Sequence, residues 1–176
     1  MIKKLMLIFG ILIVVIYIIM LIPRDFNKTY EGVKYRLGDK GNITLEKVTI
    51  EFKGEVFRDL ILKEKFRGKL KINDFIIPQK ECLKESFVID FEYHNRIKIE
   101  DLNLDRYANR MKRTFYGDLY MNRSRKKLSI VVLEDGKWSS EDGLIISAPS
   151  TTREEALEIT NELMRHMLDE DFTEFE

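Results

Sequence analysis

The chain has 176 residues, of which 34% are charged and 44% are hydrophobic, so it can form one domain of ordinary size plus an appendage. Its 30 basic and 30 acidic residues balance, which excludes a strong attraction of the whole chain to nucleic acid. The single cysteine, Cys82, excludes an internal disulfide.

The N-terminal segment MIKKLMLIFGILIVVIYIIMLIPRDF contains an apolar run from Leu5 to Ile22. As a helix this run would be about 27 Å long, close to the hydrocarbon thickness of a bilayer. We therefore predict an uncleaved signal-anchor, a single transmembrane helix over residues 1–22. Because Lys3 and Lys4 precede the run, we expect a cytoplasmic N-terminus and an extracytoplasmic C-terminal domain at the cell membrane.

Three other interpretations of this segment compete with an anchor. A cleaved signal peptide needs a shorter apolar stretch and a small-residue cleavage site, and MLIPRDFNK offers no such site. A lipoprotein signal needs a cysteine directly after the run, and the residues there contain none. A buried core helix suits an apolar segment of this length poorly.

Residues 23–29 are expected to form a short polar linker. From Tyr30 onward hydrophobic and polar residues alternate, for example in VKYRL (33–37), and the same period of two recurs in later segments. This pattern predicts half-buried strands of an antiparallel sheet. NRSRKK (122–127) has the composition of a hairpin turn, whereas 102–111 fits either a short helix or a loop.

The segment GLIISAPSTTREEALEIT (143–160) reads as a strand, a turn and the start of a helix. Thr152 and Glu155 have the spacing of a capping box. Thr151 and Glu154 have the same spacing and would place the box one residue earlier. We predict a helix over 153–168, which completes an α+β domain at 30–168, and an acidic tail at 169–176. The hydroxyl groups lie in neither a nucleophile motif nor a phosphate-binding loop.

No residue pattern predicts a catalytic site or a metal site, and no cofactor is expected. Asp101, Asn103 and Asp105 match the first three ligands of a calcium loop, but Arg106 and Lys112 stand where the loop needs glycine and glutamate. The remaining candidate ligands lack the spacing of a zinc site: His94, His166 and Cys82.

Basic residues gather between positions 106 and 127, with tyrosines interleaved. One interpretation is a contact with an anionic surface, either anionic lipid headgroups or an anionic cell-wall polymer. The residues assigned to this contact are Arg123, Arg125, Lys126 and Lys127. A solvated turn that balances acidic residues elsewhere explains the same pattern.

In the order of its parts, the chain resembles uncharacterised small single-pass membrane-anchored proteins of Gram-positive bacteria. The residues that carry the resemblance are TYEGVKYRLGD, FRGKLKI, GDLYM, KKLSIVVLEDGKW and GLIISAPSTTREEALEI. The resemblance implies a location at the cell membrane and a chain built of an anchor followed by a domain. It implies no activity. We expect a non-enzymatic, membrane-tethered binding module at the bacterial cell envelope. An envelope hydrolase with a carboxylate site and an accessory subunit of a membrane complex stay open as alternatives.

Overall fold

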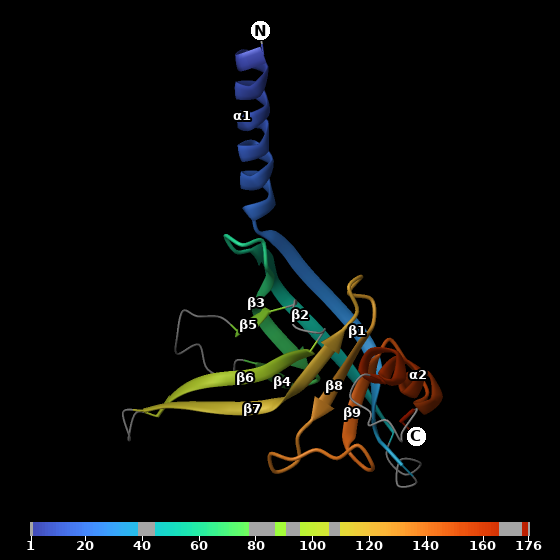
Figure 1. Cartoon of the computed structure of the whole chain (residues 1–176). Coiled ribbons are helices and arrows are strands. Elements are labelled where there is room, and N and C mark those ends of the chain that lie inside the picture. Colours follow the sequence, from blue (N-terminus) through green and yellow to red (C-terminus); the bar gives the residue numbers. More distant parts are fainter. Residues whose placement is uncertain are drawn as a thin grey trace.

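The structure is a computed structural model of the chain that describes residues 2–38, 45–77, 87–90, 96–105, 110–165 and 174–175 (Figure 1). The elements are α1 (Ile2–Leu21), β1 (Arg24–Arg36), β2 (Glu46–Arg58), β3 (Glu64–Ile72), β4 (Phe75–Ile77), β5 (Phe87–Asp90), β6 (Arg96–Asp105), β7 (Arg110–Met121), β8 (Leu128–Val132), β9 (Leu144–Ala148) and α2 (Arg153–Met164).

Nine strands in the described part of the chain form one sheet, and their pairings are antiparallel. The strand order is β4-β3-β2-β1-β9-β8-β7-β6, and β5 pairs with β3. β4 pairs with Leu70–Ile72 and β5 with Lys65–Gly68, so these two strands follow one another along the same edge of β3. The predicted antiparallel sheet with a C-terminal helix is confirmed.

The sheet curls around a core of its own. The ring of Phe75 on β4 lies 5.1 Å from the ring of Tyr116 on β7, although five strands lie between them in the sheet order. Aromatic rings fill the end of this core nearest to α1, where Phe52 packs edge-to-face against Phe26 and Phe66 at 5.9 and 5.7 Å. Such burial of aromatic side chains is a large part of what stabilises the curled sheet.

Two glycines allow β2 and β3 to bend together. Gly54 and Gly68 are partners in the β2–β3 register. A Cβ atom at Gly54 would lie 2.2 Å from the carbonyl oxygen of Arg67 and 2.6 Å from Cα of Gly68. Only glycine fits this close approach of two backbones. Both glycines therefore lie inside long strands rather than at strand ends.

Helix α2 covers the outer face of the sheet and packs on β1, β8 and β9 (Figure 1). Its N-cap is Thr152, whose hydroxyl accepts a hydrogen bond from the backbone N–H of Glu155 at 3.3 Å. The carboxylate of Glu155 accepts from the backbone N–H of Thr151 at 2.7 Å, one residue earlier than a capping box requires. The predicted helix start is confirmed, and positions 166–168 lie outside the described residues.

Two segments differ from the sequence-based expectation. The sheet extends into the expected linker, because residues 24–29 belong to β1 and pair with β2, and Phe26 is buried. The strand alternation therefore begins at Phe26, four residues before Tyr30. In the expected acidic tail, Phe175 is buried, and its backbone N–H donates to Oδ1 of Asn161 at 2.7 Å. A buried phenylalanine ring holds this part of the segment against α2.

Helix α1 stands apart from the domain (Figure 1). Its side chains from Ile11 to Ile16 are between 45% and 57% exposed, and six consecutive residues cover every face of a helix. No helix among the described residues meets the length and apolar character expected of a membrane span. The contact with the domain includes Tyr17, whose hydroxyl donates to the carbonyl oxygen of Leu60.

Candidate functional site: an apolar cavity with a polar mouth

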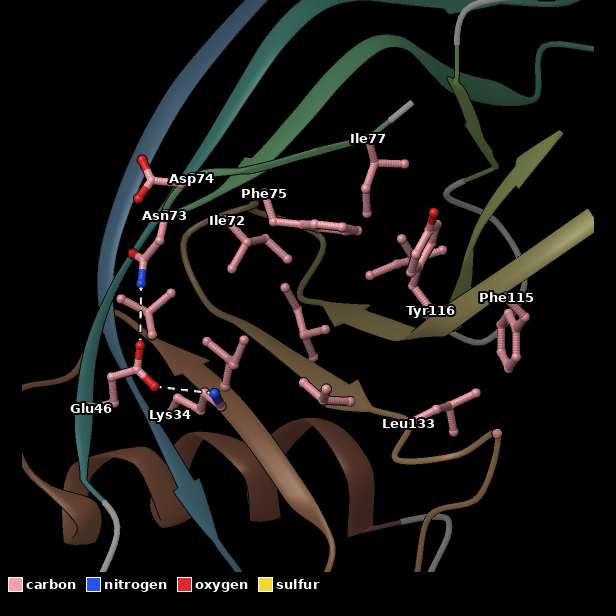
Figure 2. A pocket seen from close by; sticks show the side chains of 16 residues that line it. Lys34, Glu46, Ile72, Asn73, Asp74, Phe75, Ile77, Phe115, Tyr116 and Leu133 are labelled. Carbon is pink, nitrogen blue, oxygen red and sulfur yellow. Dashed lines mark hydrogen bonds and ion pairs between the residues drawn. The ribbon is translucent and has the colours of Figure 1, made fainter. Parts of the chain in front are cut away.

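A cavity of about 570 Å³ lies inside the curled sheet, at the end away from α1. Figure 2 shows the side chains that line it, which come from β1, β2, β3, β4, β6, β7, β8, β9 and the turns between strands. The apolar and aromatic residues that line it are Val48, Ile72, Phe75, Ile77, Ile99, Phe115, Tyr116, Ile130, Val132, Leu133 and Ile146. The volume falls within the roughly 300–1,000 Å³ of typical small-molecule sites.

The walls follow from the period of two along each strand. Ile130 and Val132 are two residues apart on β8, so both side chains point inward. On β4 the side chains of Phe75 and Ile77 line the cavity, whereas Ile76 between them is 44% exposed on the outer side. The strand pattern thus identifies the inner face of the sheet.

Polar side chains form a connected group at the mouth of the cavity. The Lys34 ammonium lies 3.1 Å from Oε2 of Glu46, and Nδ2 of Asn73 donates to Oε1 of Glu46 at 3.5 Å (Figure 2). Asn73 is fixed by the backbone of Thr49, which donates to its Oδ1 at 2.9 Å and accepts from its N–H at 2.9 Å. Its φ of 51° is a conformation that asparagine tolerates in tight turns.

Two aromatic rings remain accessible beside this mouth. Phe75 and Phe115 are each 37% exposed although both line the cavity. The ring of Tyr116 meets Phe75 at an interplanar angle of 70°, so these rings form an edge-to-face pair across the gap between β4 and β7 (Figure 2). An apolar ligand that enters would cover the exposed parts of these rings.

The opposite end of the curled sheet is closed by the β7–β8 turn, which holds the predicted contact residues. Arg125 forms an ion pair with Glu64, and its guanidinium lies 5.4 Å from the centre of the Phe26 ring. The carbonyl oxygen of Arg125 accepts from the Tyr30 hydroxyl at 2.7 Å and from Nζ of Lys28 at 3.0 Å. Arg125 therefore belongs to the structure of this closed end.

The other three predicted contact residues differ in their surroundings. Lys127 pairs with Glu162 of α2, and the hydrogen bond from its ammonium to that carboxylate raises the pKa of Lys127. Arg123 and Lys126 are exposed at the tip of the turn. The structure thus brings all four residues into one turn, but two of them carry ion pairs within the domain.

The described lining of the cavity contains apolar side chains, one tyrosine, one asparagine and three charged residues. Serine, cysteine and histidine are absent from the lining residues that the structure describes. No group of three or more His, Cys, Asp or Glu residues in the described part of the chain could hold a metal ion. Asp101, Asn103 and Asp105 lie on the extended strand β6, whereas Cys82, His94 and His166 lie outside the described residues.

Comparisons with family models, with curated proteins and with solved structures find no match to this chain.

Proposed function

We propose that this chain is a membrane-tethered, non-enzymatic binding module that holds an apolar small molecule in the cavity of its curled sheet. The observation that carries the proposal is the cavity itself, which combines about 570 Å³ of space with apolar walls and one polar mouth. Such a combination is typical of ligand sites, because the apolar walls supply affinity and a few polar groups fix the orientation.

The mouth indicates the polarity of the ligand. Lys34 is already paired with Glu46, and Asp74 adds a second carboxylate to the lining. One ammonium beside two carboxylates disfavours an anionic ligand by charge repulsion. We infer an apolar chain or ring system whose polar end is uncharged, such as a hydroxyl group that could bond to Asn73 or Glu46.

The tether in this proposal is α1, inserted into the cell membrane as a single pass. Apolar side chains exposed on every face of a helix need a cover that surrounds it, and lipid supplies one. The 20 residues of α1 give a length of about 30 Å. With Lys3 and Lys4 on the cytoplasmic side, the domain lies outside the cell, at the envelope.

The test uses a neutral long-chain alcohol that carries a photoreactive diazirine. The full chain in lipid nanodiscs is irradiated with the probe, and adducts are assigned to peptides by mass spectrometry. We expect adducts on the cavity strands that excess unmodified alcohol removes. Adducts spread evenly over the domain surface would contradict the proposal.

A matched pair of variants makes this test specific to the cavity. Ile72→Trp places a large ring inside the cavity, whereas Ile76→Trp places the same ring on the outer side of the neighbouring strand. We expect the cavity adducts to fall about tenfold or more in Ile72→Trp, which corresponds to a loss of about 1.4 kcal/mol in binding free energy. The adducts should be unchanged in Ile76→Trp, and equal labelling of the two variants would refute a ligand in this cavity.

A further inference from the structure

The tip of the β2–β3 hairpin, residues 59–63, presents large apolar side chains to solvent. Leu60 is 78% exposed and Ile61 is 71% exposed, and Leu62 beside them is also exposed. Single exposed apolar residues are ordinary, but three in succession at the end of a projecting hairpin form an apolar knob. This apolar knob has no cover within the described domain.

The apolar knob lies beside the membrane end of the domain. The Tyr17 hydroxyl of α1 donates to the carbonyl oxygen of Leu60. Tyr17 stands four residues before Leu21, the end of α1, which is about 6 Å along the helix axis. If α1 is embedded, Leu60 therefore lies at the depth of its last helical turn, and Figure 1 shows the hairpin reaching up to the base of α1.

The backbone of the turn is suited to a region with little water. Oδ1 of Asp59 accepts from the N–H groups of Ile61 at 3.1 Å and Lys63 at 2.9 Å. The N–H of Asp59 donates to the Lys63 carbonyl at 3.0 Å, and the N–H of Leu62 donates to the Asp59 carbonyl at 2.8 Å. Because these polar groups are satisfied inside the turn, its outward surface is mainly the apolar side chains.

Charged residues set how deep the apolar knob can go. Burial raises the pKa of Asp59, but hydrogen bonds from the backbone of Lys63 and from Lys65 outweigh it and lower the pKa overall. The Lys65 ammonium lies 3.1 Å from Oδ2 of Asp59. Asp59 is therefore ionised at neutral pH, and this charged pair stays at the level of the headgroups while the residues beyond it can enter the acyl boundary.

We propose that Leu60, Ile61 and Leu62 form a second membrane contact, which inserts into the lipid interface beside α1 and fixes the angle between the domain and the bilayer. The proposal rests on the insertion of α1 stated above. Lipid is the occupant because the apolar knob is continuous with the apolar surface of α1, through the contact of Tyr17 with Leu60.

The experiment places an environment-sensitive fluorophore at single cysteines of the full chain, in a Cys82→Ser background. Three variants are reconstituted in nanodiscs with and without spin-labelled lipid: Ile61→Cys at the apolar knob, Leu12→Cys in the middle of α1, and Ser140→Cys in the exposed segment between β8 and β9. Quenching by the lipid spin label reports contact with lipid at each position.

We expect lipid-dependent quenching at positions 61 and 12, a blue-shifted emission at both, and neither effect at position 140. Quenching at 12 without quenching at 61 would overturn the second contact and leave the tether intact. Absence of quenching at 12 would refute the tether and the contact that depends on it. A blue shift at 61 without quenching would show that protein covers the apolar knob, which also refutes the proposal.

Discussion

Replacement of Thr160 by valine is expected to destabilise the domain more than its small change in shape suggests. Thr160 is fully buried between α2 and the sheet. Its Oγ1 lies 2.6 Å from the Tyr35 hydroxyl and 2.8 Å from Oγ of Ser147, and it donates to the Ala156 carbonyl at 3.0 Å. A hydroxyl has one proton and two acceptor lone pairs, so Tyr35 and Ser147 both donate to Thr160.

The magnitude follows from this assignment. Valine removes the acceptor of two buried donors, and each unsatisfied buried group costs about 1–3 kcal/mol. Ser147 retains a second hydroxyl neighbour, Ser129, at 2.9 Å, so part of its loss is recovered. We therefore expect Thr160→Val to lower the free energy of unfolding by about 2–4 kcal/mol, mostly through Tyr35.

The measurement is denaturant unfolding of the full chain in mild detergent, followed by the fluorescence of Trp138. This residue is the one tryptophan of the chain, and its ring lies 6.2 Å from the ring of Phe175 beside α2. Thr160→Ser is the control, because it keeps the hydroxyl and loses only a methyl group. Tyr35→Phe combined with Thr160→Val should cost clearly less than the sum of the two single variants. A cost for valine no greater than that for serine, or an additive double variant, would contradict these hydrogen bonds to Thr160.

Two further predictions concern the closed end of the sheet. Burial raises the pKa of Tyr30 from 10.0 to about 12, against an opposing effect from the charge of Arg125. The stability contributed by neutral Tyr30 is therefore complete below pH 10 and is lost as the pH rises through 12. Tyr30→Phe should flatten the fall in unfolding free energy over this window, and an unchanged slope in denaturant titrations would contradict the assignment. Reversal of charge at Arg123 and Lys126, with Arg125 and Lys127 kept, should weaken retention of the detergent-solubilised chain on immobilised teichoic acid. The loss should be largest at low salt, and equal retention would leave the turn as a solvated surface.

The sequence predicts those parts of the fold that depend on neighbouring residues. The capping spacing of Thr152 and Glu155 locates the start of α2 because the hydrogen bonds of a helix start are local. The turn at 122–127 is predicted for the same reason, since Asn122 accepts from the backbone N–H groups of Lys126 and Lys127 within that turn. Alternation along β2 likewise places Val48, Ile50 and Phe52 on one buried face.

The curling of the sheet depends on contacts between distant residues, and so the cavity was not predicted. Alternation along β1 suggests that Val33 and Tyr35 face the core and that Lys34 faces water. Val33 and Tyr35 do lie in a core, but it is the outer one that α2 covers. Lys34 lies on the inner side, at the mouth of the cavity. A rule that assigns one face of each strand to solvent therefore fails for β1, because β1 is buried on both faces.

A charged residue within an otherwise apolar strand face is thus the signal that could have located the site. Lys34 is an even number of residues from Phe26 and Tyr30 on β1, so it lies on the same face of the strand as these two residues of the inner core. Its partner Glu46 lies on the same face of β2 as Val48 and Ile50, which also belong to the inner core. Each strand therefore carries an inward-facing charge where the core ends, and the two charges meet because β1 pairs with β2.

The two ends of the curled sheet also bear on where a ligand would come from. β1 runs from Arg24, next to α1, to Lys34 at the cavity mouth, a distance of about 33 Å along an extended strand. The end toward α1 is filled by aromatic rings and closed by Arg125. If the apolar knob holds the domain upright on the bilayer, the open mouth faces the aqueous phase. In the function proposed here, a lipid therefore cannot pass sideways from the membrane into the cavity, and the ligand must arrive through water or from a second protein. A sparingly soluble molecule with a small polar end satisfies both the apolar walls and this route of entry.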